Sequence, residues 1–170
     1  LALFCLGAGR AVADEIIDNG DPQTSSTGVW GVSGGLDPFD HDSDPNATSL
    51  WSRDGSTYTW TFTPTESGFH ELSMWWTQYP SRSTTIPVDI EYWGKTDRKI
   101  INQQADGGKW NSIGLYPFEA GVDYKITITA EPGGAQNYST CADAVQLVYQ
   151  PELNVPPVAA IDAISPNGDL

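Results

Sequence analysis

Short strand-like runs separated by turn-forming residues dominate this sequence. From Ile16 to Tyr149 these runs alternate with clusters of Gly, Pro, Asp and Asn, and no long stretch repeats apolar residues every 3.6 positions. Aromatic residues are frequent, with seven Trp, seven Tyr and five Phe, and such residues favour strands over helices. The pattern predicts an all-β fold, an antiparallel β-sandwich, over residues 14–150.

Nine segments carry the strand pattern. They are residues 15–18, 29–32, 57–63, 69–76, 85–92, 99–103, 113–118, 124–130 and 142–149. Within segment 69–76, alternation places one set of side chains on a single, core-facing side: His70, Leu72, Met74 and Trp76. Phe69 and Trp75 point to the other side, which is predicted to be covered by a loop or exposed for binding.

The two ends of the chain differ from this pattern. Residues 1–13 hold an apolar run too short to span a bilayer, followed by an Ala-Val-Ala cleavage pattern, as in a signal peptide. We therefore expect a secreted, extracellular protein. Residues 151–157 are predicted to be a proline-rich linker. Residues 158–170 look like the opening of a polycystic-kidney-disease-type immunoglobulin-like domain, so other domains of the same chain are expected partners.

Charge and motifs limit the classes of function. The 22 acidic and 8 basic side chains give a net charge of −14, which repels nucleic acid and anionic membranes. The motif H-E-x-x-H does not occur and the histidines number two, so no catalytic activity is expected. Cys141 lies in a predicted strand, where an inert buried thiol is the expected state.

An acidic loop is the first candidate for a metal site. Its residues alternate at the spacing of calcium-loop ligands: Asp40, Asp42 and Asp44. Pro45 and Trp51 stand where an EF-hand loop needs Gly and Glu, so a solvated loop is favoured and calcium in another geometry is the alternative. Asp18 and Asp143 form a second candidate metal site, because the first and last strands of jelly-roll sandwiches commonly lie side by side and can share a structural ion. No other cofactor is expected.

Carbohydrate binding needs a flat aromatic platform beside planar polar groups. The candidate ligand-binding residues are Trp75, Tyr79, Arg82, Trp110 and Asn111. Three other tryptophans are expected in the core: Trp30, Trp60 and Trp76. Trp110 also leans towards a packing role, whereas Trp75 and Tyr79 are open to either interpretation. The net charge favours neutral glycans over acidic ones.

Eight short segments together carry a family resemblance. They are IIDNGD (16–21), STGVW (26–30), SGG (33–35), MWW (74–76), RSTTIP (82–87), NQQ (102–104), GKWNSIG (108–114) and CADAV (141–145). In this order and spacing they resemble the golvesin C-terminal domain, also described as the xanthan-lyase carbohydrate-binding-like domain. The resemblance implies a jelly-roll-like, galactose-binding-like sandwich that serves as an accessory module in exported bacterial proteins. The acidic segment 37–46, and His70 in place of a more usual Tyr, depart from the family pattern.

Three functions remain open, in decreasing order of support. The first is a non-catalytic carbohydrate-binding or accessory module of a secreted multidomain protein, with a polysaccharide or cell-surface glycan as partner. The second is a structural spacer or adhesion domain without a glycan ligand. The third is a catalytic domain, for which the sequence offers no paired-acid or nucleophile–base signature.

Overall fold

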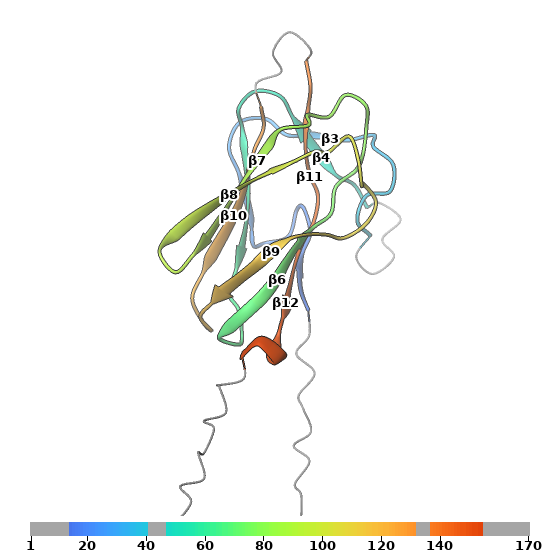
Figure 1. Ribbon diagram of the computed structural model, residues 1–170. Helices are drawn as coiled ribbons and strands as arrows, with labels where there is room; N and C mark the ends of the chain where they lie inside the picture. The colour runs from blue at the N-terminus through green and yellow to red at the C-terminus, as the bar shows by residue number, and fades with distance from the viewer. Residues whose placement is uncertain (1–13, 41–46, 132–136, 155–170) are drawn as a thin grey trace, which may run out of the picture.

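The computed structural model describes residues 14–40, 47–131 and 137–154, which form a β-sandwich (Figure 1). One layer has the strand order β1 (Glu15–Ile17), β12 (Val145–Tyr149), β6 (Gly68–Met74) and β9 (Asn111–Phe118). The other has the order β2 (Thr24–Ser26), β5 (Thr57–Phe62), β10 (Tyr124–Thr129), β7 (Ile86–Tyr92) and β8 (Lys95–Ile101). A small third sheet at one end has the order β11 (Thr140–Ala142), β4 (Leu50–Ser52) and β3 (Gly31–Val32).

Every strand pair in the three sheets is antiparallel, and the described residues contain no α-helix. The prediction of an all-β antiparallel sandwich is therefore confirmed. Within these residues, no helix has the length and apolar character needed to cross a bilayer.

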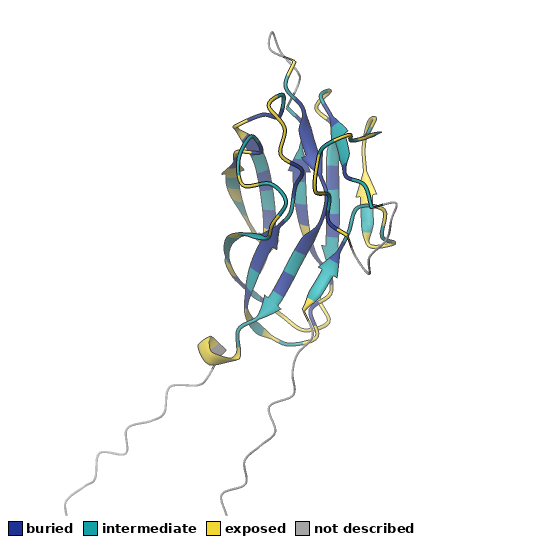
Figure 2. Cartoon of the chain, turned by 90° about the vertical axis from the view of Figure 1, so that its right-hand side faces the viewer, coloured by how far each residue is buried: buried dark blue, intermediate teal, exposed yellow. Residues whose placement is uncertain are grey.

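The core lies between the two larger sheets, where alternate strand residues turn inward (Figure 2). On β5, β7 and β10 these are Tyr58, Trp60, Phe62, Ile86, Val88, Ile90, Ile126 and Ile128. From β6 and the residues after it, His70, Leu72, Met74 and Trp76 are all buried, which confirms the predicted inward face. Burying each large apolar side chain contributes about 1.5–3 kcal/mol, so this packing stabilises a domain that has no disulfide among its described residues.

The strands that the sequence did not predict are short or polar. The edge strand β2 consists of Thr, Ser and Ser, and β4 has only three residues, so neither shows an apolar alternation. Strand β8 begins at Lys95, before the predicted start at residue 99. The sequence pattern did not reveal its first residues because they are polar, as is common in a strand at a sheet edge. The predicted segment 142–149 is interrupted at Asp143, between β11 and β12.

A tight hairpin joins β7 and β8. Trp93 and Gly94 occupy its turn with φ angles of 44° and 67°, the left-handed conformations of a type I′ turn. Glycine adopts such angles without strain. The turn leaves Trp93 exposed to solvent at the tip of the hairpin.

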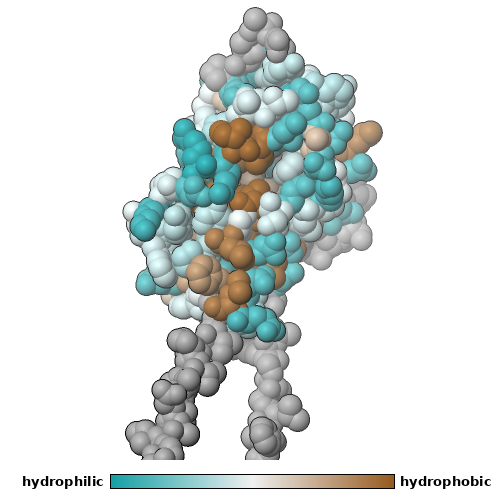
Figure 3. All heavy atoms as spheres, viewed as in Figure 1, coloured by the Kyte–Doolittle hydropathy of each residue, from teal (hydrophilic) through white to brown (hydrophobic). Residues whose placement is uncertain are grey.

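The neighbouring edges of the two large sheets carry apolar side chains. Figure 3 shows a narrow hydrophobic stripe on this face, bordered by hydrophilic surface. Ile100 on β8 and Leu115 on β9 are exposed, and Tyr116 Oη on β9 donates a hydrogen bond of 2.9 Å to Asp97 on β8. The stripe follows the line where the two layers meet.

Several predictions fall at the ends of the described chain or beyond them. Residues 151–154 form a 3₁₀ helix (Pro151–Asn154) that packs against β6. The predicted signal peptide (1–13) and immunoglobulin-like opening (158–170) lie outside the described residues, as do residues 155–157 of the linker. These remain predictions.

Candidate functional site

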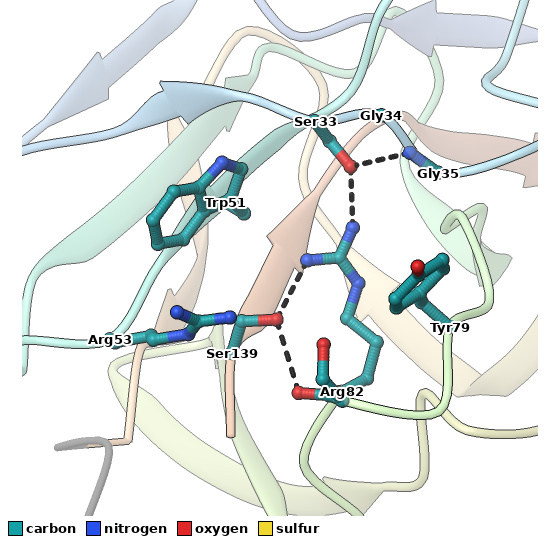
Figure 4. A pocket seen from close by; sticks show the side chains of 9 residues that line it. Ser33, Gly34, Gly35, Trp51, Arg53, Tyr79, Arg82 and Ser139 are labelled. Atoms are coloured by element: carbon teal, nitrogen blue, oxygen red, sulfur yellow. Dashed lines mark hydrogen bonds between the residues drawn. The ribbon is translucent and has the colours of Figure 1, made fainter. Parts of the chain in front are cut away.

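A pocket of about 210 Å³ opens beside the small sheet (Figure 4). Its lining comes from the segment after β3, from β4 and the residue that follows it, from the loop after β6, and from the segment before β11. The lining residues are Ser33, Gly34, Gly35, Trp51, Arg53, Tyr79, Ser81, Arg82 and Ser139. We call it the Arg82 pocket. Its volume lies below the 300–1,000 Å³ typical of drug-sized ligands, so it suits a single small unit.

The guanidinium of Arg82 is held in place by hydroxyl and carbonyl oxygens. Its two terminal nitrogens donate to Ser139 Oγ at 2.9 Å, Ser33 Oγ at 2.6 Å and Thr77 Oγ1 at 3.0 Å, and Nε donates to the Thr77 carbonyl at 3.3 Å. The residue is 3 % exposed. Burial lowers the pKa of Arg82 below its ordinary value. Arg82 therefore fixes three segments around the pocket.

A turn before Arg82 presents Tyr79 at the rim. The Arg82 amide donates to the Tyr79 carbonyl at 3.0 Å, and Arg82 bridges Ser139 as an isolated pair of β residues. The Tyr79 ring is 51 % exposed, and it flanks Arg82 on the side away from Trp51 (Figure 4). A ring that is exposed beside fixed donors is available to a ligand.

Trp51 and Arg53 form the opposite wall. The Trp51 indole donates to the Val32 carbonyl at 3.2 Å, and the Arg53 guanidinium carbon lies 4.7 Å from the centre of the Trp51 ring. Gly31 pairs with Trp51 across the small sheet, and a Cβ at position 31 would lie 3.2 Å from the indole nitrogen. The absence of a side chain at Gly31 thus lets the indole lie close to the neighbouring strand.

The electrostatics of the pocket are positive. None of its described lining residues has a carboxylate, an imidazole or a thiol. The charge of Arg53 disfavours protonation of Arg82 and contributes to the lowered pKa of Arg82. Arg53 Nε is shielded from solvent and has no hydrogen-bond partner among the described residues. The pocket therefore offers positive charge and a donor nitrogen that no described residue uses.

Of the five residues predicted to bind a ligand, Tyr79 and Arg82 line the pocket. Trp75 and Trp110 instead form an aromatic cluster with Phe39, with ring centroids 4.9–5.5 Å apart. The Trp75 indole also donates to the Asp37 carbonyl at 2.9 Å. The rings of Trp75 and Trp110 therefore hold the chain around residues 37–39 against the β6 and β9 layer.

Asn111, the fifth predicted residue, stabilises a turn. Its side-chain amide donates to the carbonyls of Asp106 and Lys109, at 2.8 and 3.0 Å. Sequence reasoning missed Trp51 and Arg53 as lining residues. A Trp-x-Arg spacing was the available signal, because residues two apart on a strand share a face.

The described residues contain no group of three His, Cys, Asp or Glu side chains that could hold a metal. Asp40 is exposed, and its two predicted partners, Asp42 and Asp44, lie outside the described residues. Asp143, the second candidate, is 1 % exposed; burial, assisted by the charge of Asp18, raises its pKa to about 9. Its carboxylate accepts the Phe39 amide at 3.2 Å.

Cys141 is buried next to Asp143. Burial raises the pKa of its thiol, which contacts the hydroxyl of Thr77 at 3.3 Å. A thiol with a raised pKa stays protonated at neutral pH and reacts slowly. This environment agrees with the inert, buried thiol expected from the sequence.

Comparison with solved structures defines the class of domain. The CBM36-1 domain of a multidomain xylanase from the hindgut metagenome of Trinervitermes trinervoides superposes with a TM-score of 0.52. The match covers 81 % of this chain and 98 % of that one at 10 % identity, so it shows a shared fold. The chain therefore has the β-sandwich fold found in carbohydrate-binding modules.

The chain belongs to the Golvesin C-terminal domain family, which matches residues 15–149. A curated relative, the xanthan lyase of Bacillus sp. (strain GL1), is 34 % identical over 90 residues, covering 52 % of this chain and 10 % of that protein. The structure of Paenibacillus xanthan lyase matches with a TM-score of 0.71 and 31 % identity, over 81 % of this chain and 13 % of that one. The chain thus spans about a tenth of the length of the relatives it matches.

Proposed function

We propose that this domain is a non-catalytic carbohydrate-binding accessory module, and that it binds a glycan in the Arg82 pocket. The main support for this proposal is that two aromatic side chains, Trp51 and Tyr79, line the same pocket as several fixed polar groups. The fold of carbohydrate-binding modules and the similarity to part of xanthan lyases support it.

The chemistry of the pocket fits a sugar ring. The apolar C–H face of a pyranose packs on an aromatic ring, and Trp51 and Tyr79 offer two such rings on opposite sides. Hydroxyl groups of the sugar then meet the polar groups between them, Ser33, Ser81 and Ser139. Because Arg82 orders these groups before a ligand arrives, little conformational entropy is lost on binding.

The lining of the pocket also supports a non-catalytic role. A serine nucleophile needs a base beside it, and the described lining residues include no carboxylate or imidazole that could serve as one. Secretion, a downstream immunoglobulin-like domain and a neighbouring catalytic domain belong to the same proposal. The sequence of residues 1–13 and 158–170 supports the first two, and the small share of the xanthan lyases that the chain covers supports the third.

The first test is truncation of the two aromatic side chains. Trp51→Ala and Tyr79→Ala are each expected to weaken binding of the best glycan found on an array by about 1–3 kcal/mol, the scale of one buried aromatic contact. Isothermal titration calorimetry measures the effect. Trp93→Ala is the matched control, because Trp93 is an exposed tryptophan at the β7–β8 hairpin and does not line the pocket.

Thermal melting separates loss of the site from loss of the fold, since Trp51 also packs against Gly31 and Arg53. Unchanged affinity in both aromatic variants would place the binding site elsewhere. If the wild-type chain binds no glycan of a broad array, the domain is a structural spacer or adhesion domain instead.

A further inference from the structure

The charges of the Arg82 pocket point to a particular kind of sugar. Building on the proposed glycan-binding function, we propose that the pocket selects a sugar that carries a carboxylate, and that Arg53 is the residue that binds this carboxylate. Uronic acids and sugars bearing an acidic substituent form this ligand class.

The first support is the distribution of ion pairs. Three cations of the described chain pair with carboxylates: Arg98 with Asp89, Lys99 with Asp97, and Lys109 with Asp106. Four other cations have no such partner among the described residues, although acidic side chains outnumber basic ones by 22 to 8: Arg53, Arg82, Lys95 and Lys125. Of these four, Arg53 and Arg82 line the same pocket, whose described lining holds no carboxylate.

The second support is the energetic state of the two guanidinium groups. The charge of Arg53 disfavours the charged form of Arg82, and the opposing influence of Asp143 comes from outside the lining, which holds no described carboxylate. Holding two like charges close together is unfavourable without a counter-charge, and the more so because Arg82 is buried. An anionic ligand group would relieve the repulsion, whereas a neutral sugar would leave it unchanged.

The third support separates the roles of the two arginines. Arg82 donates hydrogen bonds to Ser33, Thr77 and Ser139, so its role is to hold the lining segments of the pocket in place. Arg53 donates to no described residue, and its Nε is shielded from solvent without a partner. A guanidinium offers two parallel N–H groups that match the two oxygens of a carboxylate. Stacking on Trp51 holds Arg53 at the wall for this contact.

The net charge of −14 argued for neutral glycans, and the local geometry reverses this preference inside the pocket. Charges separated by more than about 8 Å are largely screened at physiological salt, whereas contacts within the pocket are not. The repulsion therefore acts on long polyanions as they approach. A short glycan, or a single acidic residue at a chain end, fits both the charge and the volume of about 210 Å³.

The test compares acidic oligosaccharides with their carboxyl-reduced counterparts, in which a primary alcohol replaces the carboxylate. Oligosaccharides ending in glucuronate, galacturonate or mannuronate are titrated into the full chain by calorimetry. The acidic form of the recognised sugar is expected to bind about 10- to 100-fold more tightly than its reduced form, the scale of a charged hydrogen-bonded pair.

Arg53→Gln is expected to remove this preference, so that the acidic and reduced forms bind the variant with affinities within about threefold of each other, because the charged contact is lost. Lys125→Gln is the matched control, since it removes one positive charge from an exposed position on β10. Arg53→Lys keeps the charge without the forked geometry and is expected to retain part of the preference. Melting temperatures verify that each variant is folded.

The outcomes separate this inference from the proposed function. Equal binding of acidic and reduced forms by the wild type would overturn the acidic-sugar inference and leave the glycan-binding function intact. A preference that survives in Arg53→Gln would also overturn it, because another group would then bind the carboxylate. Absence of binding to both forms, and to every neutral glycan on an array, would overturn the proposed function itself.

Discussion

Replacing Arg82 by Met is expected to lower the free energy of unfolding by about 2–4 kcal/mol. The side chain joins Ser33 after β3, Thr77 after β6 and Ser139 before β11 through four hydrogen bonds. Thr77 and Ser139 are almost fully buried, so their oxygens lose a donor that water replaces poorly. Relief of the Arg53–Arg82 repulsion offsets part of this loss. Urea unfolding followed by tryptophan fluorescence measures the change.

Arg82→Lys is the informative companion variant. An ammonium group keeps the charge, but it cannot span the acceptors that the planar guanidinium reaches, so an intermediate loss is expected. Arg53→Met serves as the control for removal of a pocket arginine, because Arg53 has no hydrogen bond to a described residue that could be lost. If Arg82→Met unfolds at the same urea concentration as the wild type, Arg82 does not hold the three segments together.

The sequence predicted the fold well where strands are long and alternate. Strand β6 and the residues after it alternate from His70 to Trp76 with one face buried, and this alternation identified the inward face. The pattern failed for β4, which has three residues and pairs on both sides within a small sheet. A strand of this length is too short to show an alternation of apolar and polar residues. It forms only because it pairs with β3 and β11, which are distant along the chain.

The sequence predicted only part of the candidate site, because one of the strands that carry it is the short strand β4. Tyr79 and Arg82 follow a strongly patterned strand, so their place in a projecting loop could be inferred. Trp51 and Arg53 come from or directly follow the strand that the pattern did not reveal, and they meet the loop only through long-range pairing. Trp75 was open to either role because alternation gives the side of a strand but not what covers that side. Phe39 and Trp110 cover it.

The largest pH effect is expected at Asp143. Its pKa is raised to about 9 in the folded chain by burial and by the charge of Asp18, against about 3.9 for an unfolded Asp. The folded state therefore holds a proton that the unfolded state releases. The stability contributed by this group is fully present below about pH 3.9 and is lost as the pH rises towards about 9. The loss amounts to about 1.4 kcal/mol per pH unit within that window.

Asp143→Asn isolates this contribution, because the amide keeps the shape and can still accept the Phe39 hydrogen bond. The variant and the wild type are expected to unfold alike near pH 4, and the variant should become progressively more stable as the pH rises to 8. Denaturant unfolding at each pH, in the presence of a chelator, measures the difference. A difference that does not change with pH would show that Asp143 is ionised in the folded state.

Repeating these measurements with calcium tests what neutralises the buried carboxylate. A proton and a cation compete for the same oxygens, and Asp18 and Asp143 were paired from the sequence as a candidate calcium site. Protonated Asp143 binds no cation, so calcium is expected to leave the free energy of unfolding of both proteins unchanged. If calcium instead stabilises the wild type at pH 8 and not Asp143→Asn, the carboxylate is a metal ligand. Its raised pKa is then that of the empty site, because a bound cation favours the ionised form.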